Sequence, residues 1–239
     1  MSGQTLRNVT VDAVVFGYSP EQNLRVLLVK RKYDPHINQW ALPGGFVQLE
    51  ESLEEAVHRE LQEETGISVG YLEQLYTFGD PDRDSRRRII SVAYLALVKP
   101  DAFELVASTD AADARWFDIR ELPELAFDHQ NILELAFKRL RNKVFYEPIG
   151  FELLDDKFPF VHLYHLYLTM LAGDGPLQAD EFEAQLERRN FKRLMLKRGL
   201  IVELNERRQQ KGSGRPARLY RFDPEKYEDM KKEGFSFEL

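Results

Sequence analysis

The stretch GGFVQLEESLEEAVHRELQEETGI, residues 44–67, combines seven glutamates and a single arginine with signals for both ends of a helix. Ser52 followed by Glu55 is the pattern of a capping box, and Gly66 stands where a left-handed residue ends a helix. On a wheel of roughly 100° per residue, four apolar residues form one stripe that faces the core: Leu53, Ala56, Val57 and Leu61. The stretch therefore predicts an amphipathic helix between the serine and the glycine.

The glutamates of this helix fall into two sets. Glu54 and Glu55 point away from the apolar stripe, whereas Glu60 and Glu64 project within about 40° of its centre, with Glu63 beside them. Carboxylates one turn apart at a buried edge repel each other and lose hydration, unless a cation compensates them. Because hard divalent cations prefer oxygen ligands, a metal site explains this pattern better than a solvated acidic helix does.

The same stretch resembles the Nudix box, G-x5-E-x7-R-E-U-x-E-E-x-G-U, in which U is a bulky aliphatic residue. Nine positions match: Gly45, Glu51, Arg59, Glu60, Leu61, Glu63, Glu64, Gly66 and Ile67. The resemblance implies the Nudix fold, an α+β arrangement with a mixed β-sheet between helices and the box as loop-helix-loop. It also implies that Glu60, Glu63 and Glu64 hold Mg²⁺ or Mn²⁺ for catalysis with help from the Gly45 carbonyl. Arg59 and Glu51 would support these carboxylates, and the family's reaction is metal-assisted cleavage of a nucleoside diphosphate linked to another group.

Four further residues are candidates for ligand binding. Arg31 and Arg83 suit a diphosphate because a guanidinium can bind phosphate oxygens with two hydrogen bonds. Trp40 and Phe46 are the first and last residues of WALPGGF, and their rings could stack on a base. Two alternatives stay open, since these aromatic rings could belong to the core and the arginines at 83–88 could form a solvated loop.

The pattern of apolar residues predicts a mixed α/β domain followed by a smaller one. Strands are expected at 9–18, 24–32, 71–79, 87–98 and 114–119, and a helix is expected at 128–144. The irregular stretch YEPIGFELLDDKFPF follows, with two prolines. We therefore predict a Nudix domain over residues 1–148 and a second domain over 149–239.

Charge is distributed very unevenly along the chain. The formal net charge is −7, yet 188–221 holds twelve Lys/Arg and two Asp/Glu, a local net charge of +10 that leaves −17 elsewhere. An acidic body with a short basic segment is typical of a protein with one part facing a polyanion. The alternative is a solvated basic face.

The basic segment lies within a pattern of three helices and a hairpin. Helices are expected at 161–173, at 179–187 with Asp180 as its cap, and from Asn190 to Gly199; strands are expected at 200–204 and 217–222. This is the plan of a winged helix-turn-helix, whose third helix enters the major groove of double-stranded DNA. The candidate DNA contacts are Arg188, Arg189, Lys192, Arg193, Lys197, Arg215 and Arg218. His162 and His165 have a spacing that could bind a metal, although core or surface histidines are the simpler interpretation.

A Nudix box followed by a winged helix resembles the Nudix-related transcriptional regulators of NAD metabolism. The resemblance is carried by RDSRRRIISVAYLALV, LAFDHQNILELAFKRLRNK, NFKRLMLKRGLI and GRPARLYRF. It implies a homodimer that binds a palindromic operator and responds to ADP-ribose or a related nucleotide. Many members of that group have a degraded box, whereas every position is filled here. A regulator that senses its ligand and a magnesium-dependent hydrolase with an accessory C-terminal domain therefore both remain open.

The remaining features of the sequence limit the cellular compartment in which the protein is expected to act. The chain has no cysteine, no apolar run long enough to span a membrane and no signal-peptide pattern in MSGQTLRNVTVDAVVF. We expect a cytoplasmic protein without disulfides and without a membrane partner.

Overall fold

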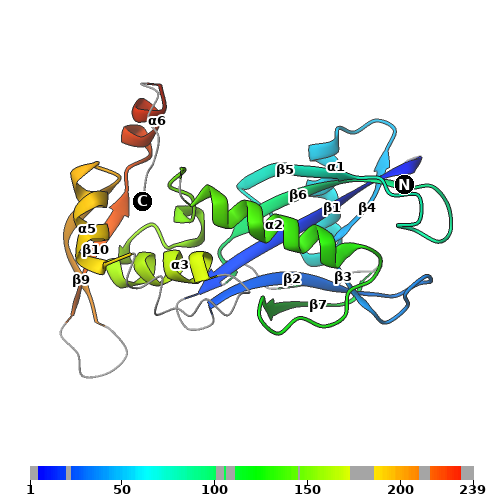
Figure 1. Ribbon diagram of the computed structural model, residues 1–239, viewed down its shortest axis with the longest axis horizontal. Helices are drawn as coiled ribbons and strands as arrows, with labels where there is room; N and C mark the ends of the chain where they lie inside the picture. Colours follow the sequence, from blue (N-terminus) through cyan, green and yellow to red (C-terminus); the bar gives the residue numbers. More distant parts are fainter. Residues whose placement is uncertain are drawn as a thin grey trace. The chain divides into compact units, whose positions relative to one another are not determined.

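The computed structural model describes residues 5–19, 23–100, 105, 111–144, 146–172, 186–209 and 216–232 (Figure 1). Contacts between residues divide the chain into two compact units, and the second consists mainly of the residues from Leu140 onward, a boundary that falls inside a helix. None of the described helices is long and apolar enough to cross a membrane.

Within the described residues, one mixed sheet of seven strands organises the first unit. Its main order is β3-β2-β1-β6-β5, while β4 pairs with β1 and β7 pairs with β2. β1 and β6 run parallel, and β5 pairs antiparallel with β6. The strands are β1 (Thr5–Ser19), β2 (Asn23–Arg31), β3 (Trp40–Ala41), β4 (Gly44–Gln48), β5 (Tyr71–Phe78), β6 (Ile90–Val98) and β7 (Ala111–Asp118). The predicted mixed sheet is confirmed, and β3 and β4 are strands that were not among those expected.

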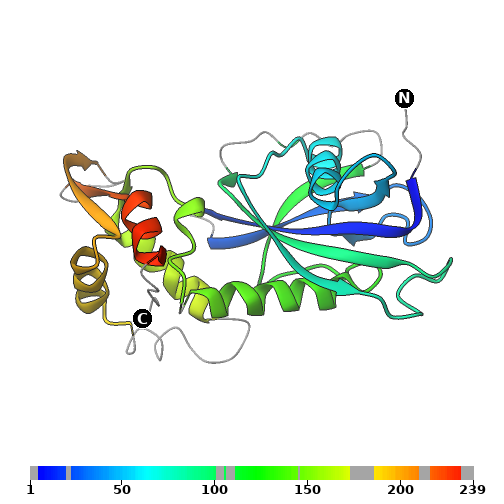
Figure 2. The same ribbon diagram turned by 90° about the horizontal axis from the view of Figure 1, so that it is seen from above.

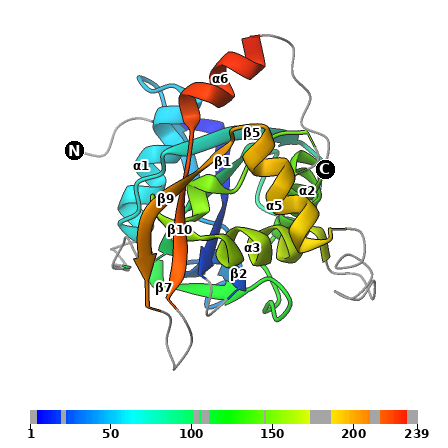
Figure 3. The same cartoon turned by 90° about the vertical axis from the view of Figure 1, so that its left-hand side faces the viewer.

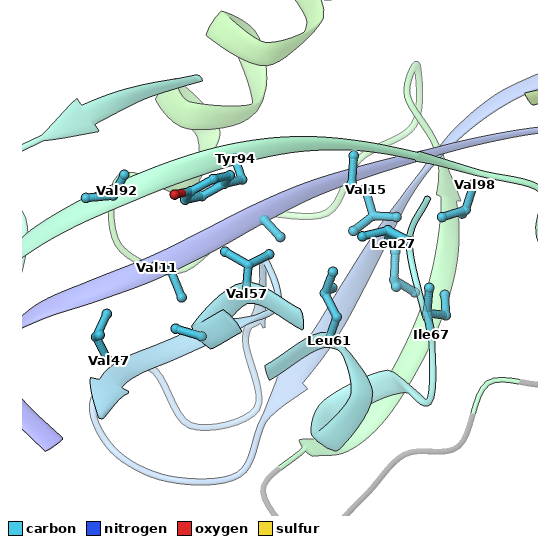
Figure 4. Packing of buried hydrophobic residues seen from close by; sticks show 14 residues of the cluster. Val11, Val15, Leu27, Val47, Val57, Leu61, Ile67, Val92, Tyr94 and Val98 are labelled. Carbon is cyan, nitrogen blue, oxygen red and sulfur yellow. The ribbon is translucent and has the colours of Figure 1, made fainter. Parts of the chain in front are cut away.

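Two helices cover the opposite faces of this sheet, as the cyan and green helices in Figure 2 show. They are α1 (Leu53–Thr65) and α2 (His129–Lys143). Because β1 is covered on both sides, its residues from Val11 to Ser19 are all buried, and apart from Asp12 and Ser19 they are apolar or glycine on both faces. Val11 and Val15 face α1, where they pack with Val57 and Leu61 (Figure 4). On the other face, the ring centroids of Phe16 and Phe137 are 6.3 Å apart.

The ends of α1 follow the capping signals. The Ser52 hydroxyl accepts a hydrogen bond from the Glu55 N–H, and the Glu55 carboxylate accepts one from the Ser52 N–H. Gly66 has φ of +74° and its N–H donates to the Gln62 carbonyl. The predicted capping box and left-handed end are confirmed, and together they determine which residues of α1 face the sheet and which face the cavity described below.

The second unit contains a helical core beside a small antiparallel sheet of order β8-β10-β9 (Figure 3). Phe191 is fully buried, and its ring lies 4.9 Å from that of Tyr167 and 5.7 Å from that of Phe160. The elements are the 3₁₀ helix η2 (Phe151–Leu153), β8 (Phe158–Pro159), α3 (Phe160–Ala172), α5 (Arg188–Lys197), β9 (Ile201–Arg208), β10 (Ala217–Phe222) and α6 (Pro224–Lys232). The predicted apolar helix, basic helix and hairpin are present; the helix expected at 179–187 falls outside the described residues, except for its last two positions.

One prediction in this unit was wrong. Asn190 does not cap the basic helix, because α5 begins at Arg188 with Glu187 as its N-cap residue. The Asn190 side chain instead donates to the Glu187 carboxylate, three residues earlier. A side-chain bond that points back to the cap places Asn190 inside the first turn. β9 also continues to Arg208, beyond its expected end, and α6 was not expected.

Candidate functional site

A cavity of about 470 Å³ lies beside α1 in the first unit. Part of its wall comes from β4 and α1: Gly44, Gly45, Phe46, Arg59, Glu60, Glu63 and Glu64. Another part comes from residues far away in sequence: Asp12, Arg31, Lys32, Tyr33, Arg83, Asp84, Arg86, Phe127 and His129. The fold thus brings the three carboxylates expected to hold a metal into one cavity with Arg31, Phe46 and Arg83.

Arg59 organises the carboxylates of this wall. Its guanidinium donates two hydrogen bonds to Glu51, at 2.7 and 2.9 Å, and further bonds to Glu60 at 2.7 Å and Glu63 at 3.0 Å. A fifth hydrogen bond, to the Phe46 carbonyl at 3.1 Å, ties the guanidinium to β4. The hydrogen bonds from Arg59 lower the pKa of Glu51, and those same carboxylates raise the pKa of Arg59. Arg59 and Glu51 therefore form a fixed ion pair behind the carboxylates that face the cavity.

Glu60 is a largely buried carboxylate of this wall. Its side chain is 13% exposed, and burial raises its pKa even though Arg59 lowers it in part. The carboxylate lies directly against β4, since a Cβ atom added to Gly45 would stand 2.3 Å from Glu60 Oε1. Glycine therefore leaves room for the carboxylate in the position where Arg59 holds it.

The other two carboxylates differ from Glu60 in exposure and partners. Glu64 Oε2 accepts a hydrogen bond from the Gly44 N–H at 2.9 Å, and the Glu63 side chain is 57% exposed. In the described part of the chain, no three acidic or histidine side chains already stand in metal-binding geometry. The donor chemistry nevertheless fits a divalent cation, because such ions prefer oxygen ligands and the cavity brings the carboxylates of Glu60, Glu63 and Glu64 together.

The predicted ligand contacts occupy different places. Arg31 and Phe46 line the cavity, and the guanidinium of Arg87 lies 5.1 Å from the Phe46 ring centroid. Trp40 does not line this cavity. Its ring packs edge-on against Phe117, with centroids 4.7 Å apart.

Arg83 also lines the cavity, but it belongs to a buried cluster that the sequence did not reveal. Its guanidinium binds Asp128 through two hydrogen bonds and lies 3.5 Å from Asp12 Oδ2. Asp12 accepts a hydrogen bond from the Ser91 hydroxyl and stands 3.6 Å from His129 Nε2. His129 Nδ1 accepts the Leu42 N–H at 2.9 Å, and burial lowers the pKa of this histidine. The neutral ring therefore holds the segment before β4 in place.

A signal for this cluster exists at one position only. Asp12 interrupts the β-branched run VTVDAVVF, and a charged residue in a strand buried on both faces needs a partner. Its partners Arg83, Ser91 and His129 are at least 71 residues away along the chain, so no local spacing indicates them.

The candidate DNA contacts gather on α5 and β10 of the second unit. Phe191 and Met195 are buried and Leu194 is half-buried, as expected for the packing face of α5. The exposed candidates are Arg188, Arg189, Arg193, Lys197 and Arg218, and Lys192 is half-buried. Arg215 lies outside the described residues.

Three of these cations line one hollow of about 360 Å³, between α3, α5 and β10: Arg188, Lys192 and Arg218. The Lys192 ammonium stands 5.0 Å from the ring centroid of Tyr220 and 5.8 Å from that of Phe160. Arg218 pairs with Glu203 across the hairpin. His162 and His165 lie one turn apart on α3, and no described residue joins them in a group of three metal ligands.

Two family models match the chain. A NUDIX domain matches residues 6–136, and an NrtR DNA-binding winged helix domain matches residues 150–222. An ADPR responsive transcriptional repressor, NtrR, of Acinetobacter baylyi is 35% identical over 225 residues, which are 92% of this chain and 84% of the relative. An ADP-ribose pyrophosphatase of Methanocaldococcus jannaschii is 42% identical over 126 residues, 53% of this chain and 70% of the relative. The crystal structure of Shewanella oneidensis NrtR complexed with a 27mer DNA has a TM-score of 0.72 and 31% identity over 96% of this chain and 97% of that one.

These matches coincide with the two sites. The Nudix match takes in the box and the cavity beside α1, and the winged-helix match takes in α3, α5 and the hairpin. The repressor and the DNA-bound structure each match across both units. The chain therefore belongs to the Nudix family, in the group whose members join a Nudix domain to an NrtR-type DNA-binding winged helix.

Proposed function

We propose that this protein is a DNA-binding transcriptional repressor that responds to ADP-ribose. The observation that carries the proposal is the match along 92% of the chain to an ADPR responsive repressor, which includes both the cavity and the basic helix. The Nudix domain, residues 1–148, would bind ADP-ribose, and the winged-helix domain, residues 149–239, would bind operator DNA as part of a homodimer. Such a protein would act where the operator is, which agrees with the expected cytoplasmic location.

A divalent cation belongs to the Nudix part of this proposal. Nudix proteins generally use such ions, and Glu60, Glu63 and Glu64 would hold Mg²⁺ or Mn²⁺ in this chain. When bound, the ion supplies positive charge for phosphate oxygens and activates water. Arg59 would keep Glu60 and Glu63 oriented, since it already binds both.

A second function, hydrolysis of ADP-ribose, is favoured by one specific observation. All nine box positions are filled, and the chain is 42% identical over its Nudix part to an ADP-ribose pyrophosphatase. Water would be added across the diphosphate to release AMP and ribose 5-phosphate. The two functions are compatible, because a repressor could also consume its own ligand slowly.

Regulation is tested by capturing genomic DNA fragments from the source organism on the full-length protein, followed by sequencing. We expect a palindromic sequence to be enriched, and ADP-ribose to change the affinity for it by about 1–3 kcal/mol, typical of coupled sites. No enriched sequence, or an affinity that ADP-ribose does not change, would rule out the proposed regulation.

Hydrolysis is tested separately by ³¹P NMR of ADP-ribose with the protein and Mg²⁺ or Mn²⁺. Appearance of AMP and ribose 5-phosphate, absent in a Glu64→Gln variant, would support the second function. Equal background signals for the wild type and the Glu64→Gln variant would mean that the protein binds ADP-ribose without cleaving it.

A further inference from the structure

The cavity beside α1 has a second wall, opposite in charge to the carboxylates. It is built around Phe127, the residue two positions before α2, and includes Arg31 at the end of β2 and Arg86 from the loop before β6. The guanidinium carbon of Arg31 lies 4.8 Å from the Phe127 ring centroid, and that of Arg86 lies 5.9 Å from it. Two cations therefore share one aromatic ring inside the cavity.

Arg31 is held in place without a carboxylate partner. Its Nε donates to the Pro35 carbonyl at 2.9 Å and its Nη2 to the Tyr33 carbonyl at 3.4 Å. Among the described residues, none accepts a hydrogen bond from its Nη1 or forms a salt bridge with it. Burial and the neighbouring Arg86 lower the pKa of Arg31, and the carboxylates of Glu64, Asp84 and Asp12 raise it in part. A phosphate would give the Arg31 Nη1 a hydrogen-bond acceptor.

Arg86 contrasts with Arg31, because it already has a carboxylate partner. It binds Asp84 through two hydrogen bonds, at 2.7 and 3.0 Å, and the Asp84 side chain is only 4% exposed. Arg86 is thus anchored at the rim of the cavity by Asp84. Arg31, in contrast, has N–H donors that no described residue uses.

The Phe127 ring is fixed by its backbone and its neighbours. Its φ of +55° is a left-handed conformation that bulky residues rarely adopt and that tends to occur at functional sites. The ring centroid lies 4.6 Å from that of His36 and 5.4 Å from that of His129. A preorganised ring that positions a guanidinium reduces the entropy lost when that guanidinium binds a ligand.

We propose that Arg31, positioned by Phe127 and Arg86, is an anion seat that binds the diphosphate of ADP-ribose without a divalent metal. The inference rests on the proposed function and deepens it, because it divides the cavity into two walls with different tasks. The carboxylate wall would serve metal-dependent cleavage, and the arginine wall would serve recognition. A sensor built in this way reports ADP-ribose whatever the metal supply.

The experiment is calorimetric titration of the full-length protein with ADP-ribose, in excess EDTA and in Mg²⁺. We expect binding in EDTA within about tenfold of the Kd in Mg²⁺. Arg31→Gln should weaken binding in EDTA by roughly ten- to a hundredfold, the loss expected for a charge-assisted hydrogen-bonded contact. Arg31→Lys, which keeps the charge but loses the planar fork, should bind with intermediate affinity. Arg120→Gln, an exposed arginine paired with Asp118 outside the cavity, is the matched control and should bind like the wild type.

The outcomes separate this inference from the proposed function. Binding that needs Mg²⁺ and disappears in EDTA would overturn the anion seat while leaving ADP-ribose as the ligand. The anion seat is also overturned if Arg31→Gln and Arg31→Lys, with thermal melts like that of the control, bind as the control does. No binding of ADP-ribose under either condition would instead overturn the proposed function.

Discussion

The guanidinium of Arg83 and the carboxylate of Asp128 form a nearly buried ion pair, closed by two hydrogen bonds of 2.7 and 2.9 Å. Arg83 lies in the loop between β5 and β6, and Asp128 immediately precedes α2. The Asp128 carbonyl also accepts hydrogen bonds from the N–H groups of Asn131 and Ile132. The pair therefore ties a long polar loop to the first turn of α2.

Replacing Arg83 with glutamine should destabilise the fold strongly. The change leaves Asp12 and Asp128 in a desolvated place without their shared cation, and breaking a buried pair costs about 3–5 kcal/mol of unfolding free energy. Urea unfolding followed by circular dichroism measures this loss. The control is Arg120→Gln, since the Arg120 side chain is 61% exposed and a surface pair contributes less than about 1 kcal/mol. Equal losses in the two variants would contradict the structural role of Arg83.

The buried ring of His129 should make stability fall in mild acid. Its pKa in the folded protein is lowered by burial, so the unfolded chain takes up the proton first, near pH 6.5. The stability that depends on the neutral ring is complete above that pH. It is lost as the pH falls below it, by at most about 1.4 kcal/mol per pH unit.

The measurement is the free energy of unfolding between pH 5 and 8, roughly the range in which histidine titrates. His129→Gln keeps a possible acceptor for the Leu42 N–H but removes the titrating ring, so its curve should be flatter than that of the wild type in the acidic range. His58→Gln, on the exposed face of α1, should leave the curve unchanged. Parallel curves for wild type and His129→Gln would refute the prediction.

Glu60 should weaken the protein when no metal is present. Burial raises its pKa, so holding it ionised at neutral pH costs free energy that a bound cation would offset. Glu60→Gln in EDTA should therefore have an unfolding free energy equal to that of the wild type or higher by roughly 1 kcal/mol. Added Mg²⁺ should raise the Tm of the wild type and not that of the variant. Glu54→Gln, which changes an exposed glutamate of the same helix, should respond to Mg²⁺ like the wild type.

Local signals explain what could be predicted from the sequence. The ends and the buried face of α1 depend on Ser52, Glu55, Gly66 and an apolar stripe within fifteen residues, so the prediction matched the structure closely. The contacts of Arg59 with Glu51, Glu60 and Glu63 are also local, since all four residues lie between positions 51 and 63.

Contacts between distant segments explain what could not be predicted. Phe127 and Arg31 are separated by 96 residues, and nothing in either neighbourhood indicates that one packs on the other. Arg83 was a candidate phosphate contact, and no local pattern indicated its partner Asp128, 45 residues away. The predicted N-cap of α5 was wrong for a different reason. Glu187 and Asn190 both lie near the start of the helix, and only the backbone conformation decides which of them is the N-cap residue.

Lys192 should contribute one phosphate contact to DNA binding. Its ammonium is held near Tyr220 and Phe160 and lines one hollow with Arg188 and Arg218, so little side-chain freedom is lost on binding. Lys192→Gln should weaken binding to the enriched operator. It should also reduce the slope of log K against log salt by about 0.9, the value for one released counterion on duplex DNA. Fluorescence polarisation at several salt concentrations gives both numbers. Arg120→Gln, which removes the same charge from the Nudix domain, should leave the slope unchanged. If Lys192→Gln keeps the wild-type slope and affinity, α5 does not bind DNA through this face.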